Sequence, residues 1–182
     1  MPINFCSHCG GRVVQQTPEG DDRPRHVCPE CGRIHYVNPR LVVGCVVEWE
    51  NKILLCQRSI EPRYGMWTVP AGFLEAGESA ADGAKRETFE EAEARVEIIA
   101  PYTLFNLTFI NQIYLLFRSR LIDGKFGKGT ESLTVGLFDE RDIPWDDIAF
   151  TAVHATLQHY VRDRAVGDFP FHMGDISPDR TR

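Results

Sequence analysis

Residues 72–94 read GFLEAGESAADGAKRETFEEAEA, a glycine-containing turn followed by residues that favour a helix. Ser79 can cap the first helical turn, and Asp82, three residues later, can return a hydrogen bond in a capping box. The alanines and basic residues of 80–86 then favour continuation of the helix. We therefore expect a turn that leads directly into a capped helix.

Three glutamates on this helix share one face. Glu87, Glu90 and Glu91 are spaced i, i+3 and i+4. Like charges at these spacings oppose a helix by roughly 0.2–0.5 kcal/mol per pair, so the cluster needs a cation to offset it. Mg²⁺ takes oxygen ligands and usually works with carboxylates and substrate phosphates. A solvated acidic face is the ordinary alternative, and the glycine-rich turn with Glu78 favours the metal site.

The same stretch resembles the Nudix box, Gly-x5-Glu-x7-Arg-Glu-U-x-Glu-Glu-x-Gly-U, where U is a bulky aliphatic residue. The residues that match in register are Gly72, Glu78, Arg86, Glu87, Glu90 and Glu91. Three positions depart, none of them a ligand position in the family: Thr88, Glu93 and Ala94. Since glycine normally supplies the left-handed stop of a helix, Glu93 predicts a different helix end.

Composition limits the class of protein. A chain of 182 residues, 43% hydrophobic and 25% charged, fits one globular domain with a small appendage. The net charge of −6 argues against a general nucleic-acid binder. Apolar runs are too short for a membrane span, and the N-terminus has no basic and apolar leader, so we expect a cytoplasmic protein. In that reducing compartment, the six cysteines of the chain suggest bound metal or free thiols before disulfides.

Two Cys-x2-Cys pairs near the N-terminus are separated by 18 residues: Cys6, Cys9, Cys28 and Cys31. This is the spacing of a four-cysteine zinc ribbon. Gly10 and Gly32 follow the pairs and can adopt the positive φ that turns backbone N–H groups toward sulfur. Few large apolar residues lie in 11–27, so the metal would supply the folding energy. Two disulfides or a redox pair are the alternative, which a reducing compartment disfavours.

Four thiolates complete a tetrahedral shell, so the zinc is expected to be structural. For the same reason His8, His26 and His35 are expected on the surface and not as ligands.

The remaining pattern predicts an α+β fold with a mixed sheet between helices. Strands are expected at 41–49, 52–58, 67–69, 96–99, 102–108, 112–119 and 132–138, and a second helix at 147–164. Cys45 and Cys56 fall in apolar runs and are expected as buried small hydrophobes. Residues 123–130 are expected to form a flexible loop. The predicted organisation is a zinc ribbon (1–36), a catalytic domain (37–165) and a tail (166–182), partly disordered from Ile176 onward.

The resemblance implies a Nudix α/β/α sandwich over most of the chain. A zinc ribbon followed by this domain is similar to the NADH pyrophosphatases. Residues 38–45, 65–75 and 171–174 are more similar to plant chloroplast Nudix enzymes that cleave FAD and ADP-ribose. At the position of the Ser-Gln-Pro-Trp-Pro-Phe-Pro motif of the NADH pyrophosphatases, residues 103–109 read TLFNLTF. This difference weakens NADH as the expected substrate and favours FAD or ADP-ribose.

The implied activity is hydrolysis of a nucleoside diphosphate linked to another moiety, giving a nucleoside monophosphate and a phosphorylated product. Mg²⁺ or Mn²⁺ would be held by Glu87 and Glu91, with Glu90 binding directly or through water. The resemblance implies roles for four further residues: the Ala71 carbonyl as a metal ligand, Arg86 as the residue that orients Glu87, and Gly72 and Glu78 as cofactor-binding residues, with Gly72 letting the backbone approach the phosphates.

One carboxylate of the family is missing. Nudix pyrophosphatases of this kind usually bring another Glu from a loop or strand after the box, and that position is Thr134 here. Glu131, next to the flexible loop, could replace it as a catalytic residue. Alternatively, the site holds fewer metal ions. Residues three apart in a regular strand face opposite sides, which weighs against the replacement.

Alternatives remain for the ligand and for the class of protein. Phe105, Phe109 and Tyr114 could stack on a base or flavin, or could be core aromatics of strands. A non-catalytic Nudix nucleotide sensor and a zinc-ribbon adaptor are the rivals of the enzyme. The sensor would lack box carboxylates, and the adaptor would show a basic stripe. We expect a homodimer that acts on a small-molecule nucleotide, without nucleic acid or membrane as partner.

Overall fold

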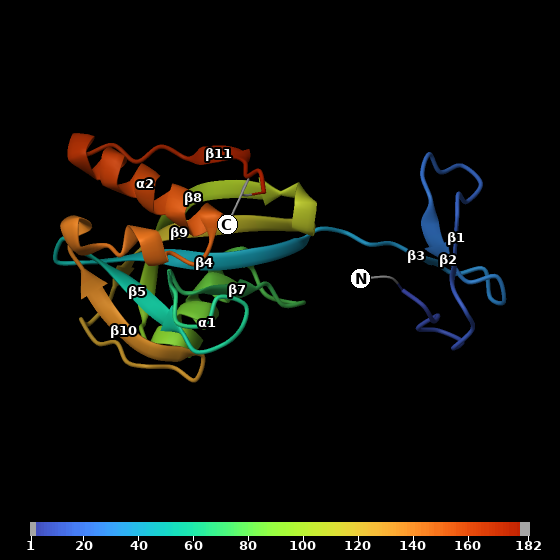
Figure 1. The fold of residues 1–182 in the computed structure, drawn as a ribbon, viewed down its shortest axis with the longest axis horizontal. Coiled ribbons are helices and arrows are strands. Elements are labelled where there is room, and N and C mark those ends of the chain that lie inside the picture. Colours follow the sequence, from blue (N-terminus) through green and yellow to red (C-terminus); the bar gives the residue numbers. More distant parts are fainter. Residues whose placement is uncertain (1–2, 179–182) are drawn as a thin grey trace. The chain divides into compact units, whose positions relative to one another are not determined.

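The computed structural model describes residues 3–178, and the chain divides into two compact units between Asn38 and Pro39 (Figure 1). The first unit contains a small antiparallel sheet in the order β1-β2-β3, formed by Val14–Gln16, Arg25–Val27 and Ile34–His35. The second unit is a sheet with a helix on each face.

The large sheet has eight strands and the order β10-β5-β4-β9-β8-β11, with β6 paired to β5 and β7 paired to β4. Its strands are β4 (Arg40–Trp49), β5 (Lys52–Arg58), β6 (Trp67–Thr68), β7 (Ala71–Phe73), β8 (Val96–Leu107), β9 (Gln112–Leu121), β10 (Ser132–Phe138) and β11 (His172–Asp175). The pairs β4–β9 and β8–β11 are parallel and the other pairs antiparallel. The predicted mixed sheet between helices is confirmed.

Two helices cover opposite faces of this sheet, α1 (Ala80–Ala92) and α2 (Thr151–Val166). Strand side chains alternate between faces, so a strand covered on both sides is apolar throughout. In β4 and β5, Cys45 and Cys56 pack toward α1, whereas Val46 and Leu55 pack toward α2. Both cysteines are buried, as predicted, and each buried aliphatic side chain contributes about 1.5–3 kcal/mol.

Ser79 caps the N-terminus of α1 as predicted, but the Asp82 carboxylate accepts its return hydrogen bond from the Ser79 hydroxyl and not from the Ser79 backbone N–H, and the C-terminal end of the helix differs from the prediction. Ser79 Oγ accepts a hydrogen bond from the Asp82 N–H, 3.2 Å away, and donates to the Asp82 carboxylate. At the other end, Glu93 has φ 47° and ψ 23° and donates its N–H to the Phe89 carbonyl. The expected change of helix end is therefore wrong, because Glu93 adopts the left-handed stop in place of glycine.

The elements around α2 differ from the prediction at both ends. The helix begins four residues later than expected because the chain is held extended: Ile148 bridges Trp67, and the Ala149 N–H donates to the Trp67 carbonyl. Short 3₁₀ turns, Glu140–Asp142 and Trp145–Asp147, precede it. After α2 the chain adds β11 as an edge strand beside β8, where only a partly disordered tail was expected. Residues 179–182 of that tail lie outside the described residues.

Two further expectations are corrected. Two strands were expected at 96–99 and 102–108, but residues 96–107 form one strand. This strand stays paired with β9 along its length, and register irregularities around Ala100 and Pro101 accommodate the residues between the two expected strands. A third 3₁₀ turn, Thr108–Ile110, joins β8 to β9. The glycine-rich segment 123–130 is not free: the N–H groups of Gly127 and Gly129 donate to the carbonyls of Ala92 and Glu91 at the end of α1. No helix among residues 3–178 is long and apolar enough to cross a membrane.

Candidate active site and zinc ribbon

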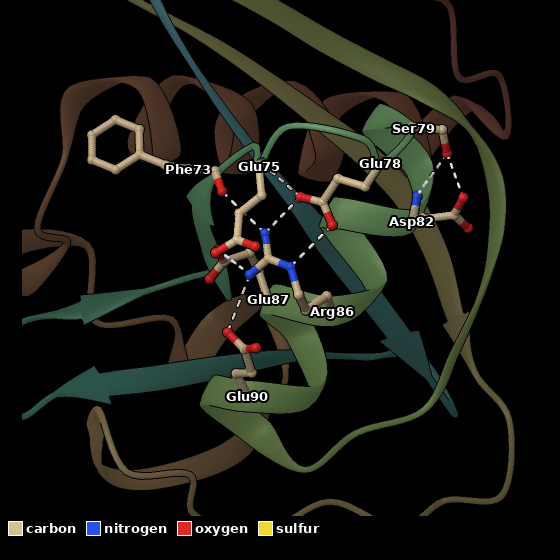
Figure 2. Close-up of polar contacts among 8 residues, drawn as sticks. All are labelled: Phe73, Glu75, Glu78, Ser79, Asp82, Arg86, Glu87 and Glu90. Atoms are coloured by element: carbon tan, nitrogen blue, oxygen red, sulfur yellow. Dashed lines mark hydrogen bonds and ion pairs between the residues drawn. The ribbon is translucent and has the colours of Figure 1, made fainter. Parts of the chain in front are cut away.

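Arg86 is the centre of a hydrogen-bonded cluster on α1 and the turn before it (Figure 2). Its Nε and Nη2 donate to the two carboxylate oxygens of Glu78, at 3.0 and 2.7 Å. Its Nη1 donates to Glu87 at 2.7 Å and to Glu90 at 3.2 Å, and Nη2 also donates to the Phe73 carbonyl. Every nitrogen of the guanidinium is thus engaged, and the arginine holds the carboxylates of turn and helix together.

Glu78 lies in this cluster as a partner of Arg86. The arginine, with the Glu75 N–H, lowers the pKa of the Glu78 carboxyl to about 2. The Glu78 carboxylate is therefore ionised and occupied, and its place in the structure is that of a brace between the turn and α1. The assignment of Glu78 as a cofactor-binding residue stays a prediction.

Glu87 occupies the space that the missing side chain of Gly72 leaves. A Cβ placed on Gly72 would lie 2.2–2.5 Å from the Glu87 carboxyl atoms, which no real contact allows. Burial raises the pKa of the Glu87 carboxyl, while its hydrogen bond to Arg86 opposes the rise. Gly72 was expected to admit phosphates to the backbone; here it admits the carboxylate of Glu87.

Glu91 is the most enclosed of the three glutamates, with 6% of its surface exposed. Burial, together with the neighbouring charge of Glu87, raises its pKa to about 8, and the Ala71 N–H opposes this rise. Its backbone carbonyl accepts a hydrogen bond from the buried Ser132 hydroxyl at 2.7 Å. Glu90, by contrast, is 56% exposed. Glu87 and Glu91 therefore point into the protein beside β7, and Glu90 points toward water.

Glu131 lies within electrostatic reach of this pair, because its charge contributes to the raised pKa of both Glu87 and Glu91. The register of β10 explains how. Ser132 pairs with Arg58 and Thr134 with Gln57, so a β-bulge places two residues against one step of β5. The bulge shifts the side-chain alternation by one residue, and the argument from a regular strand against Glu131 no longer applies.

The carboxylates of Glu87, Glu91 and Glu131 fit a hard divalent cation. They repel one another and two of them are partly or largely buried, which a cation would offset. They do not form a closed cage: among residues 3–178, the cysteine cluster is the only group of three or more His, Cys, Asp or Glu side chains placed to hold a metal ion as it stands. Such an open donor set suits Mg²⁺ or Mn²⁺, which keep waters and take phosphate oxygens as further ligands.

The four cysteines of the first unit fit zinc. Their Sγ atoms all lie within 4.8 Å of one another, with Cys6–Cys31 at 3.7 Å and Cys9–Cys28 at 3.4 Å. A zinc ion with Zn–S bonds of about 2.3 Å needs sulfurs about 3.8 Å apart, whereas a disulfide needs about 2.05 Å. All four are free thiols, so the alternative of disulfides is not what the structure shows.

The two cysteine turns repeat one hydrogen-bond pattern. The N–H groups of Gly10 and Gly32, with φ 79° and 72°, donate to the carbonyls of Cys6 and Cys28. His35 differs from expectation, because its Nε2 lies 3.3 Å from Cys6 Sγ instead of facing only water. An imidazole N–H at a ligand sulfur is an outer-sphere contact of the kind that tunes a metal site.

Comparison with known proteins agrees with this geometry. Residues 38–149 match the model of the NUDIX domain, and residues 4–37 match that of the Nudix N-terminal zinc ribbon. The chain belongs to the Nudix family. The crystal structure of a NUDIX hydrolase from Nitrosomonas europaea is 52% identical, with a TM-score of 0.94, and covers 97% of this chain and 100% of that one.

Two curated Nudix relatives carry names of activities. The NAD-capped RNA hydrolase NudC of Vibrio parahaemolyticus is 30% identical over 88% of this chain, which spans 60% of the length of that relative. The ADP-ribose pyrophosphatase of Methanocaldococcus jannaschii is 26% identical over 60% of this chain and 67% of its own length.

Two residues of the Nudix site escaped the sequence-based prediction. Ser132 holds the Glu91 backbone, and Arg58, 9% exposed at the end of β5, carries a positive charge that favours ionised Glu91. A serine at a strand start and an arginine at a strand end are common, so only the fold shows their position. Among the aromatic candidates, Phe105 and Tyr114 are buried and Phe109 is 47% exposed.

Proposed function

We propose that the protein hydrolyses the diphosphate bond of a nucleoside diphosphate linked to another moiety, in the NAD and ADP-ribose class and including FAD. The observation that carries the proposal is the pair formed by the half-buried Glu87 and the buried Glu91, within electrostatic reach of Glu131. The names of the two relatives support the substrate class. Because all box carboxylates are present, the sensor is disfavoured.

The chain's own residues would divide the work as follows. Glu87, Glu91 and Glu131 would hold Mg²⁺ or Mn²⁺, which supplies positive charge to the diphosphate and makes water more acidic. Arg86 holds Glu87 in place by a 2.7 Å hydrogen bond. A glutamate with a raised pKa is suited to take a proton near neutral pH, which makes Glu91 a candidate for the base. Glu131 is the other candidate, because it begins the turn into β10 beside the box glutamates.

The test is a screen of FAD, ADP-ribose, NADH and diadenosine polyphosphates with Mg²⁺ or Mn²⁺, in which products are separated by chromatography. We expect a nucleoside monophosphate and a phosphorylated product from at least one compound, and no product from Glu87→Gln. Equal rates in wild type and Glu87→Gln would reject the assigned site. Absence of turnover on every compound would favour the sensor.

NAD-capped RNA is a second candidate substrate, favoured by the name of the NudC relative and opposed by the net charge of −6. Adding a capped oligonucleotide to the screen separates the two. The homodimer stays a prediction, which light scattering on the purified protein would test. The cytoplasmic location also stays a prediction, and cell fractionation would test it.

A further inference from the structure

The four sulfurs of the ribbon differ in their access to water. The first cysteine of each pair, Cys6 and Cys28, is buried. The second cysteine of each pair, Cys9 and Cys31, is exposed. Four thiolates around one Zn²⁺ carry a net double negative charge, which water or N–H donors have to offset. A buried thiolate cannot draw on water for this, so the protein must supply its donors.

Cys6 is the buried sulfur to which the protein brings a side-chain donor. The Nε2 atom of His35 lies 3.3 Å from Cys6 Sγ, and the backbone N–H of His8 donates to the same sulfur at 3.4 Å. A zinc-bound thiolate has no hydrogen to give, so the imidazole must be the donor, with its hydrogen on Nε2. Among residues 3–178, His35 is the only histidine whose side chain makes a hydrogen bond to a cysteine sulfur.

The small sheet of the ribbon fixes where this imidazole lies. The Cys28 N–H donates to the Arg33 carbonyl at 2.9 Å, which closes the second cysteine turn just before β3 begins. In the pairing of β3 with β2, His35 lies directly opposite His26. Directly opposed residues of an antiparallel pair point to the same face, and both histidines are half-buried. His26 is therefore a matched neighbour of His35 that lacks the contact to sulfur.

We propose that His35 is a positioning residue of the zinc site: its Nε2–H holds and shields the Cys6 thiolate, so that soft electrophiles modify the ribbon at Cys9 and Cys31 and not at Cys6. The inference concerns the ribbon and goes beyond the proposed hydrolysis of a diphosphate. Outer-sphere partners of a metal ligand fix its orientation, and their loss typically weakens metal binding about 10- to 100-fold. The same hydrogen bond withdraws electron density from sulfur, which lowers its nucleophilicity.

The test compares the full-length wild type with His35→Ala, His35→Gln and the matched control His26→Ala. Glutamine can place an amide N–H near the position of Nε2, so it keeps the donor without the ring. Zinc affinity is measured by competition with a chromophoric chelator. In protein loaded with Co²⁺, the thiolate-to-cobalt charge-transfer band reports the ribbon alone, because the carboxylate site has no sulfur ligand.

The third measurement is brief treatment of the zinc-loaded protein with N-ethylmaleimide, followed by mass spectrometry of its peptides. The sulfur forms a bond to an alkene carbon of the reagent, its bond to zinc breaks, and the neighbouring carbon takes a proton from water. In wild type we expect Cys9 and Cys31 to be modified before Cys6.

We expect His35→Ala to lower zinc affinity about 10-fold or more, the loss typical of an outer-sphere partner. Its charge-transfer band should move to lower energy, because the Cys6 sulfur becomes richer in electrons, and Cys6 should be modified as early as Cys9. His35→Gln should stay close to wild type in all three measurements, and His26→Ala should match wild type. Complete loss of metal from His35→Ala, with the other two variants still loaded, would be the same result in a stronger form.

An unchanged zinc affinity and an unchanged charge-transfer band in His35→Ala would overturn the inference. An equal change in His26→Ala would also overturn it, because the effect would then follow from a loosened pairing of β2 with β3. If His35→Gln behaves like His35→Ala, the ring and not its N–H matters, and the inference is wrong. Modification of Cys6 before Cys9 and Cys31 in wild type would equally contradict the shielding. None of these results bears on the proposed hydrolysis.

Discussion

Replacing Glu91 by glutamine should stabilise the protein in the absence of Mg²⁺ and Mn²⁺, and more so at high pH. Burial and Glu87 raise the pKa of Glu91 from 4.5 to about 8. The folded protein therefore binds more protons than the unfolded chain between these two values, and its stability falls as pH rises through that window. The rise corresponds to about 5 kcal/mol of unfolding free energy when the carboxylate is fully ionised in both states.

Glutamine removes the buried charge and keeps the shape of the side chain. We expect Glu91→Gln to exceed wild type by about 3–5 kcal/mol in unfolding free energy at pH 8.5 and by about 1 kcal/mol at pH 5.5. Urea unfolding followed by tryptophan fluorescence measures the difference. Buffers are freed of Mg²⁺ with a resin and contain no chelator, so that zinc stays bound, and comparison at equal pH cancels the effect of pH on the zinc site.

Glu90→Gln is the matched control, since Glu90 is 56% exposed on the same helix. Its substitution should change the unfolding free energy by less than about 1 kcal/mol at both pH values, as is usual for exposed ion pairs. The reasoning is refuted if Glu91→Gln is no more stable than wild type at pH 8.5, or if its advantage is the same at both pH values.

The remaining predictions concern the ribbon, the fourth carboxylate and the helix end. Metal analysis should find about one zinc per chain, and none in Cys28→Ser, because three sulfurs do not complete a four-thiolate shell. Protein expressed with ample zinc whose four ribbon cysteines still react as free thiols would contradict the zinc site. Glu131→Gln should abolish turnover, and Thr134→Glu should not raise it. An unchanged rate in Glu131→Gln together with a higher rate in Thr134→Glu would show that the site lacks a carboxylate and holds fewer metal ions. Glu93→Gly should raise the unfolding free energy by about 1 kcal/mol, since Glu93 has φ 47°; a loss of stability would mean that its side chain holds the glycine-rich loop.

Local patterns predicted the parts of the fold that local chemistry determines. The Ser79 cap, the face shared by the box glutamates and the alternation in β4 and β5 follow from neighbouring residues. The order of the strands does not, because β4–β9 pairing joins segments far apart in the chain. The strand β11 is short and exposes Met173, so no periodicity could reveal it.

The site was predictable as a set of residues and not as an arrangement. The register of the box placed Glu87 and Glu91 on one helix face, but their burial depends on β7 and on the loop that closes over the end of α1. The orientation of Glu131 depends on a β-bulge, which a two-residue period cannot foresee. Arg58 joins the site only because the fold brings the end of β5 within electrostatic reach of Glu91.

Phosphorus NMR of ADP-ribose incubated with the protein and Mg²⁺ in ¹⁸O-water tests the hydrolysis of a diphosphate most directly. The account predicts that the diphosphate resonances are replaced by two phosphomonoester resonances, one of them shifted by ¹⁸O because water attacks phosphorus. Glu91→Gln should leave the diphosphate resonances unchanged. Phosphomonoesters without ¹⁸O on either phosphorus, or products formed as fast by Glu91→Gln, would contradict it.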